Sequence, residues 1–163
     1  MNKTSKSKLA IIILVLMLTL SCAKHIPEQH FAAENAEFDL LIGGVTSEFK
    51  DVIVSRLVDR YKDQGNIDLV DYDKINQVQC EDYDVILVMD DSEAWTLWNF
   101  SLKSFLKRTE NCNNIVLFIT AGDPDWEYQY NDLDAITSAS VVENEDKVFN
   151  ELTAKIDGMI SKI

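Results

Sequence analysis

Short runs of apolar residues alternate with amphipathic stretches along most of this chain. Two runs, Tyr83–Met89 and Ile115–Thr120, are nearly continuous in Val, Ile and Leu, which is typical of strands buried on both faces. The expected elements are strands at Phe38–Ile42, Ile67–Val70, Tyr83–Met89, Ile115–Thr120 and Ala135–Ser138, with helices ending near Tyr61 and Arg108 and a last helix at Lys147–Ile163. This alternation predicts an α/β domain with a doubly wound parallel sheet.

The helix after the first strand is predicted from its apolar spacing. Val52, Ile53, Leu57, Val58 and Tyr61 fall on one face, and Gly65 follows as a natural stop. The polar stretch between the second and third strands, from Asp73 to Asp82, is too short to predict a regular helix.

The amino terminus has the pattern of an export signal. Lys3, Lys6 and Lys8 precede the aliphatic run Leu9–Leu20, which is too short to span a bilayer as a permanent helix. Ser21 and Cys22 end the run and resemble the lipobox of bacterial lipoproteins, in which the cysteine is acylated after cleavage. We therefore predict a signal peptide at residues 1–21, a lipid on Cys22 and a polar tether at residues 22–37. The alternative is an ordinary secretory peptide in which Cys22 is an incidental thiol.

Charge limits the partners of the exported domain. Removing residues 1–21 deletes three lysines and no acids, so the net charge changes from −13 to −16. Nucleic-acid binding is not expected, because neutralising phosphates supplies most of that affinity. Anionic lipids would also repel the domain, so its membrane attachment is expected to be covalent.

Histidine chemistry is not expected either. Both histidines, His25 and His30, fall in the predicted tether. The folded part is therefore expected to have no histidine, which excludes catalysis by a Ser-His-Asp or Cys-His group and metal sites with histidine ligands.

Several motifs resemble flavodoxins. Asp82–Leu87 is similar to the approach to their third strand, Ser101–Leu106 to the start of the following helix, and Ile115–Thr120 to their fourth strand. Asp134–Ser140 resembles the tail of exported, uncharacterised flavodoxin-like proteins. The resemblance covers residues 38–163 and implies a five-stranded parallel sheet in the order 2-1-3-4-5.

Ligands of such sheets bind outside the carboxyl ends of the strands. The corresponding loops here are Gly43–Glu48, Asp90–Trp98, Ala121–Tyr130 and Thr137–Ser140. In flavodoxins the first loop holds the FMN phosphate. Here Thr46 and Ser47 could do so, but the family's spacing is altered, and a helix-capping role for either residue is favoured over phosphate binding.

The second and third loops contain every tryptophan of the chain: Trp95, Trp98 and Trp126. They could stack on a flat ligand such as the flavin ring or contact a protein partner, or they could only cover the end of the sheet. The carboxylates Asp90, Asp91, Asp123 and Asp125 in these loops could instead hold a hard cation, although no calcium-loop motif is present. A response-regulator function is excluded, because the first strand ends in two glycines rather than two acids.

Two cysteines remain after Cys22. Cys80 and Cys112 each precede a strand, and the flavodoxin order would make those strands neighbours. Outside the cytoplasm the two thiols could form a structural disulfide.

Together these features predict a lipid-anchored protein of the bacterial envelope. Its flavodoxin-like domain is expected to bind a small ligand or an envelope protein with a degenerate phosphate loop, and a catalytic role is less favoured. The alternative is an FMN-binding electron-transfer protein.

Overall fold

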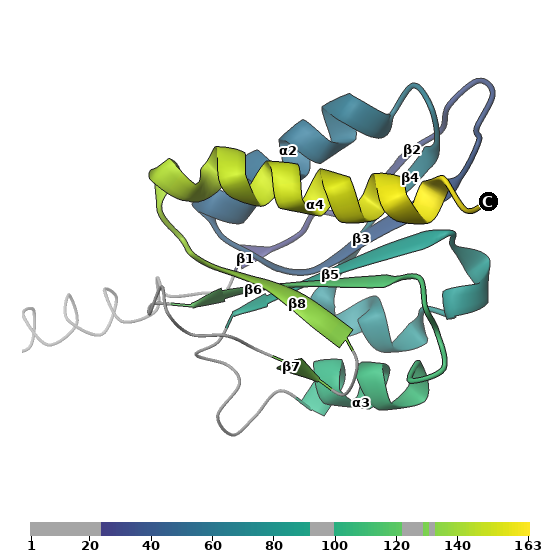
Figure 1. Cartoon of the computed structure of the whole chain (residues 1–163). Helices are drawn as coiled ribbons and strands as arrows, with labels where there is room; N and C mark the ends of the chain where they lie inside the picture. The colour runs from purple at the N-terminus through teal and green to yellow at the C-terminus, as the bar shows by residue number, and fades with distance from the viewer. Residues whose placement is uncertain (1–23, 92–99, 122–128, 131–132) are drawn as a thin grey trace, which may run out of the picture.

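The computed structural model describes residues 24–91, 100–121, 129–130 and 133–163. Within these residues, eight strands form one sheet with helices on both sides (Figure 1). The strands are β1 (Lys24–His25), β2 (Gln29–Phe31), β3 (Asp39–Thr46), β4 (Asn66–Asp71), β5 (Val85–Asp91), β6 (Ile115–Ala121), β7 (Gln129–Tyr130) and β8 (Leu133–Ala139). The helices are α2 (Glu48–Tyr61), α3 (Phe100–Arg108) and α4 (Glu145–Ile160), with short 3-10 segments η1 (Tyr72–Gln77), η2 (Cys80–Asp82) and η4 (Val142–Asn144).

The centre of the sheet is parallel, as predicted. Strands β4, β3, β5, β6 and β8 are neighbours in that order, which is 2-1-3-4-5 when the five are numbered among themselves. The predicted strand count was nevertheless too small. Strands β2 and β7 extend the two edges and β1 pairs with the end of β3, all antiparallel, so the complete order differs from the predicted one. Strands of two or three residues are too short for hydrophobic periodicity to detect.

The prediction that residues 22–37 form a tether was wrong for its middle part. Strand β2 pairs with β4, with His30 opposite Asp68, and Ile26 is 3% exposed within the core. Histidine is thus part of the fold: His30 Nδ1 lies 2.7 Å from Asp68 Oδ1, and the Tyr83 hydroxyl donates to the other carboxylate oxygen of Asp68. The exclusion of histidine chemistry, which assumed an unstructured segment, no longer holds.

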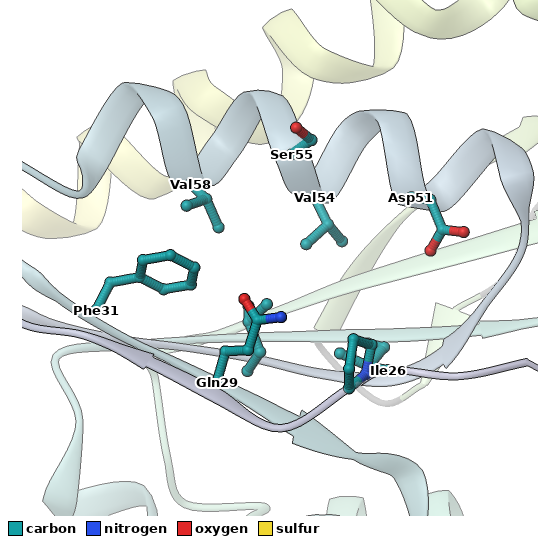
Figure 2. A pocket seen from close by; sticks show the side chains of 9 residues that line it. Ile26, Gln29, Phe31, Asp51, Val54, Ser55 and Val58 are labelled. Atoms are coloured by element: carbon teal, nitrogen blue, oxygen red, sulfur yellow. The ribbon is translucent and has the colours of Figure 1, made fainter.

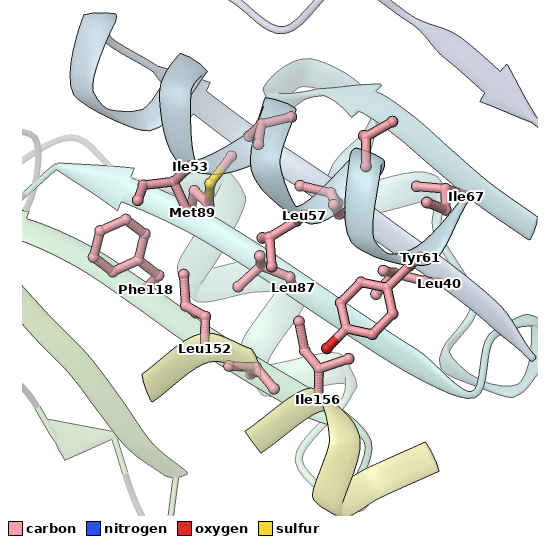
Figure 3. Packing of buried hydrophobic residues seen from close by; sticks show 14 of the residues in the cluster. Leu40, Ile53, Leu57, Tyr61, Ile67, Leu87, Met89, Phe118, Leu152 and Ile156 are labelled. Carbon is pink, nitrogen blue, oxygen red and sulfur yellow. The ribbon is translucent and has the colours of Figure 1, made fainter. Parts of the chain in front are cut away.

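Residues alternate between two cores across the sheet. Leu40, Leu87 and Phe118 point toward α2 and α4, whose Ile53, Leu57, Leu152 and Ile156 complete one core (Figure 3). Leu41, Ile86 and Leu117 pack on the other side with Phe105 of α3 and Ile75 of η1. Burial on both faces explains why β5 and β6 read as continuous apolar runs.

Strand β3 is longer than predicted and absorbs most of the first expected ligand loop. The predicted strand ended at Ile42, but Gly43, Gly44, Val45 and Thr46 continue it. Gly44 has φ +131°, and a Cβ there would lie 1.9 Å from the carbonyl oxygen of Met89 in β5. The glycines therefore allow close strand packing rather than forming a flexible phosphate loop.

The helices agree with the predicted ones apart from their ends. Helix α2 begins at Glu48, before the first apolar residue of the predicted face, and α4 covers Glu145–Ile160 rather than 147–163. Between β4 and β5 the structure has only the 3-10 segments η1 and η2, which agrees with the lack of a helical pattern there.

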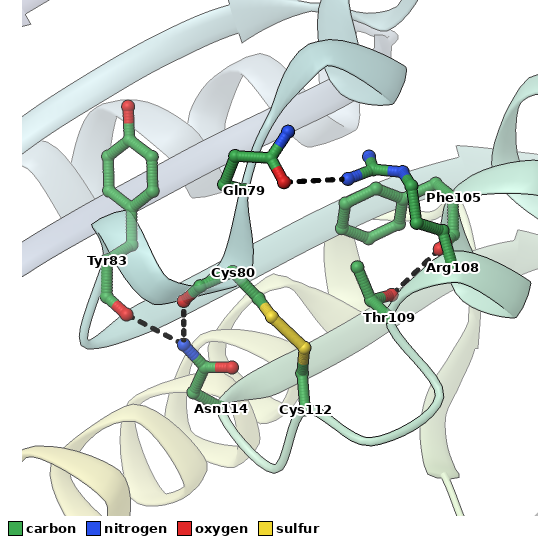
Figure 4. The surroundings of a disulfide bond; sticks show 8 residues. All are labelled: Gln79, Cys80, Tyr83, Phe105, Arg108, Thr109, Cys112 and Asn114. Atoms are coloured by element: carbon green, nitrogen blue, oxygen red, sulfur yellow. Dashed lines mark hydrogen bonds between the residues drawn. A yellow bond between two sulfur atoms is a disulfide. The ribbon is translucent and has the colours of Figure 1, made fainter.

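Cys80 and Cys112 are joined by a disulfide, with their Cα atoms 6.4 Å apart (Figure 4). Cys80 lies in η2 before β5, and Cys112 lies before β6, so the bond joins the amino ends of two neighbouring strands. Asn114 reinforces this corner, because its Nδ2 donates to the carbonyl oxygens of Cys80 and Tyr83 at 2.8 and 2.7 Å.

Replacing both cysteines by alanine is expected to lower the free energy of unfolding by about 3 to 4 kcal/mol, because the bond constrains a long loop in the unfolded chain. The loop joins residues 32 positions apart. Urea unfolding followed by circular dichroism, on oxidised wild type and the double variant, measures the change. An unchanged midpoint would show that the bond contributes nothing to stability, and reduced wild type should behave like the variant.

Candidate functional site

The carboxyl ends of the parallel strands meet at one edge, where Thr46, Asp71, Asp91, Ala121 and Ala139 end β3, β4, β5, β6 and β8. We call this the carboxyl edge. It is the usual position of ligands in open parallel α/β sheets. Of the side chains predicted there, Trp95, Trp98, Trp126, Asp123 and Asp125 lie outside the residues that the structure describes.

The amino terminus of α2 is capped by the chain itself. Ser47 is the N-cap residue, and its Oγ accepts a hydrogen bond from the Lys50 backbone N–H at 3.3 Å. The Thr46 hydroxyl donates to Asp51 Oδ1 at 2.5 Å. Ser47 thus has the arrangement of the capping alternative, in which a side-chain oxygen satisfies an orphan N–H of the first turn, whereas Thr46 bonds to the Asp51 side chain instead.

The charge at this helix end does not fit a dianionic phosphate. Glu48 and Asp51 both lie in the first turn of α2, where their carboxylates already interact favourably with the helix dipole. A phosphate bound beside them would be repelled by both. Strand β1 also pairs with Val45 and Thr46, so the N-terminal segment occupies one side of the turn.

A buried lysine connects α2 to the ends of β5 and β6. Lys50 has no exposed side-chain surface, and its Nζ donates to the carbonyl oxygen of Asp90 at 2.8 Å and to Asp91 Oδ1. The Thr120 hydroxyl donates to the same Asp91 oxygen at 2.5 Å. We call Lys50, Asp91 and Thr120 the lysine cluster.

Burial dominates the electrostatics of this cluster. Loss of hydration lowers the pKa of Lys50 below its usual value of 10.5, while the charge and hydrogen bond of Asp91 and the charge of Asp90 oppose that change. The Asp91 side chain is 43% exposed, so one partner of the pair is buried and the other reaches solvent. The hydrogen bonds from Lys50 and Thr120 therefore fix the position of the Asp91 carboxylate and leave part of it exposed to solvent.

The cation site proposed from the sequence receives no support from the described residues. Asp91 is paired with Lys50, and Asp90 Oδ1 accepts a hydrogen bond from the Asp91 N–H at 2.8 Å. In the part of the chain that the structure describes, no group of three or more His, Cys, Asp or Glu side chains could hold a metal ion.

Lys50 was not predicted as a site residue, although its position relative to the apolar residues of α2 indicated that it would be buried. It lies three, four and seven residues before Ile53, Val54 and Leu57, on the stripe that packs on the sheet. A lysine inside an apolar helical stripe is rarely buried without a partner. The sequence did not reveal the partner, because Asp91 is 41 residues away.

A groove of about 290 Å³ runs along α2, between this helix and the N-terminal segment (Figure 2). Val54 and Val58 line one wall, Ile26 and Phe31 line the opposite one, and Asp51 lies at one end. Its volume is near the lower limit of about 300 Å³ for ligand sites, so it suits a small, mostly apolar molecule.

Comparison with known proteins adds no family assignment: no family model and no curated protein sequence matches this chain. Among the described residues, none of the helices has both the length and the apolar character needed to cross a membrane.

Proposed function

We propose that this protein is a lipid-anchored module of the bacterial cell envelope whose flavodoxin-like domain binds a small ligand or a protein partner at the carboxyl edge. The observation that favours this binding role over electron transfer with FMN is that a side chain of the protein itself caps the amino terminus of α2. Ser47 accepts the Lys50 N–H where a flavin carrier would need free N–H groups for a phosphate, and the Asp51 carboxylate, bonded to Thr46, lies in the same first turn.

Two further features support the proposal. The disulfide between Cys80 and Cys112 favours an oxidising compartment outside the cytoplasm, in agreement with a signal peptide at residues 1–21. The groove beside Asp51 provides space for a small ligand without any need for a phosphate. An electron-transfer role with FMN is the rival function.

Titration of the oxidised protein with FMN separates the two roles. We expect no saturable quenching of FMN fluorescence up to concentrations well above micromolar, because Glu48 and Asp51 oppose the phosphate. Saturable binding of FMN at micromolar concentration or below would instead establish the flavin carrier. Riboflavin, which lacks the phosphate, shows whether any binding depends on that group.

A double alanine variant, Thr46→Ala with Ser47→Ala, tests the same point from the protein side. If Ser47 caps α2 and Thr46 only bonds to Asp51, the variant should lose about 1 kcal/mol of stability, mainly from the lost N-cap. Urea unfolding measures this loss. A variant that unfolds like the wild type but loses FMN binding would contradict the capping role and favour a phosphate site.

A further inference from the structure

The chain enters the fold at the carboxyl edge. Strand β1 is antiparallel to β3, and Lys24 pairs with Thr46, the last residue of β3 (Figure 1). Strand β2 then runs antiparallel to β4, from Gln29 opposite Leu69 to Phe31 opposite Ile67. The N-terminal segment therefore leads from the carboxyl edge toward the opposite end of the sheet.

This entry point is held by packing as well as by pairing. His25 pairs with Val45, and the next residue, Ile26, is 3% exposed in the core shared with α2 and α4. Residues from Lys24 onward thus belong to the domain and do not lengthen the link to a membrane anchor.

The link that remains is very short. Cys22 lies two residues before Lys24. Two extended residues span about 7 Å at most. The sixteen-residue tether predicted from the sequence would have let the domain adopt any orientation, whereas a link of this length does not.

We infer that the carboxyl edge is the membrane-facing surface of the protein and lies against the lipid headgroups. The inference rests on the proposed acylation of Cys22. Strand β3 has eight residues, so the opposite end of the sheet, near the disulfide, lies roughly 25 Å farther from the bilayer. Asp91 of the lysine cluster, whose side chain is 43% exposed, then lies on the membrane-facing side.

Two exposed positions at opposite ends of α2 test this orientation. Glu48 begins the helix at the carboxyl edge, and Asp63 follows its other end. A 14-residue helix separates them by roughly 20 Å. Each is changed to cysteine in the full chain, purified with its acyl groups from membranes and labelled with a fluorophore under non-reducing conditions that preserve the disulfide.

The labelled proteins are placed in phosphatidylcholine vesicles that contain a nitroxide-labelled lipid, and fluorescence quenching is measured. We expect the label at Glu48→Cys to be quenched several-fold more strongly than the label at Asp63→Cys. Inserting a flexible Gly-Ser segment of about twelve residues between Ala23 and Lys24 should remove the difference, because the link no longer limits orientation.

Failure of the orientation and failure of the anchor give different results. Equal quenching at both positions, or stronger quenching at Asp63→Cys, would overturn the inference in protein whose mass shows the acyl groups on Cys22. Membrane-purified protein with an unmodified Cys22 would overturn the proposed lipid anchor itself, and the orientation with it.

Discussion

Replacing Gly44 by alanine is expected to destabilise the protein by about 4 kcal/mol or more, because it combines a strained backbone with a clash inside the sheet. Gly44 has φ +131°, a conformation that residues with a Cβ rarely adopt. The added Cβ would lie 1.9 Å from Met89 O and 2.8 Å from Met89 C, atoms of the neighbouring strand that cannot move away as a side chain could.

Gly158→Ala is the matched control. Gly158 lies within α4, and a Cβ added there meets no atom within 4 Å. The control should therefore gain up to about 1 kcal/mol from the higher helix propensity of alanine. Urea unfolding of both variants measures the contrast. Wild-type stability for Gly44→Ala would mean that β3 and β5 do not approach each other at Gly44 as closely as described.

Gly44 also shows why the end of the first strand could not be predicted from the sequence. Gly43 and Gly44 were interpreted as a loop after the first strand, because glycine usually interrupts a strand pattern. Their actual role depends on the backbone of Met89, which is 45 residues away in the chain. A local pattern cannot report a contact with a distant strand, so the strand end and the ligand loop were both misplaced.

The central sheet was predictable for the opposite reason. Strands β5 and β6 are buried on both faces, so almost every residue in them carries the signal. Strand β2 has only three residues, of which Gln29 and His30 are polar and exposed. Its stability comes from pairing with β4 rather than from its own composition, which is why the segment resembled a tether.

At the candidate site, sequence identified the carboxyl edge and the residues Thr46, Ser47 and Asp91, but not how they are connected. Asp91 was considered as a cation ligand. In the structure its charge is balanced by Lys50 of α2. Strand β4 lies between this helix and β5, the strand that ends with Asp91. Long-range pairing of opposite charges leaves no periodic pattern in the sequence.

Asp91→Asn is expected to lower the free energy of unfolding by about 3 kcal/mol at neutral pH, because it removes the carboxylate bonded to the buried Lys50 ammonium and leaves only the charge of Asp90 nearby. Lys50 is fully buried, and its remaining described acceptor is the carbonyl oxygen of Asp90. Asp59→Asn is the control: it removes the partner of Lys62 from a pair that is 41% and 68% exposed. Such a surface pair contributes less than about 1 kcal/mol.

The loss caused by Asp91→Asn should depend on pH. Burial lowers the Lys50 pKa, so between that lowered pKa and 10.5 the unfolded chain binds more protons than the folded protein, and stability rises with pH. Asp91 raises the Lys50 pKa, and removing it moves the start of this window to lower pH. The deficit of the variant relative to wild type should therefore be largest near neutral pH and shrink as the pH approaches 10.5, as urea unfolding at several pH values can show.

The double variant Lys50→Met with Asp91→Asn separates the pair from its parts. Methionine keeps most of the buried stem of Lys50 but has no ammonium to leave unpaired. The double variant should therefore be more stable than Asp91→Asn alone, and its stability relative to wild type should no longer recover as the pH rises toward 10.5. If the two variants were equally stable, the loss of stability would persist after the Lys50 ammonium is removed. That result would show that Asp91 contributes through its hydrogen bond with Thr120 or through packing.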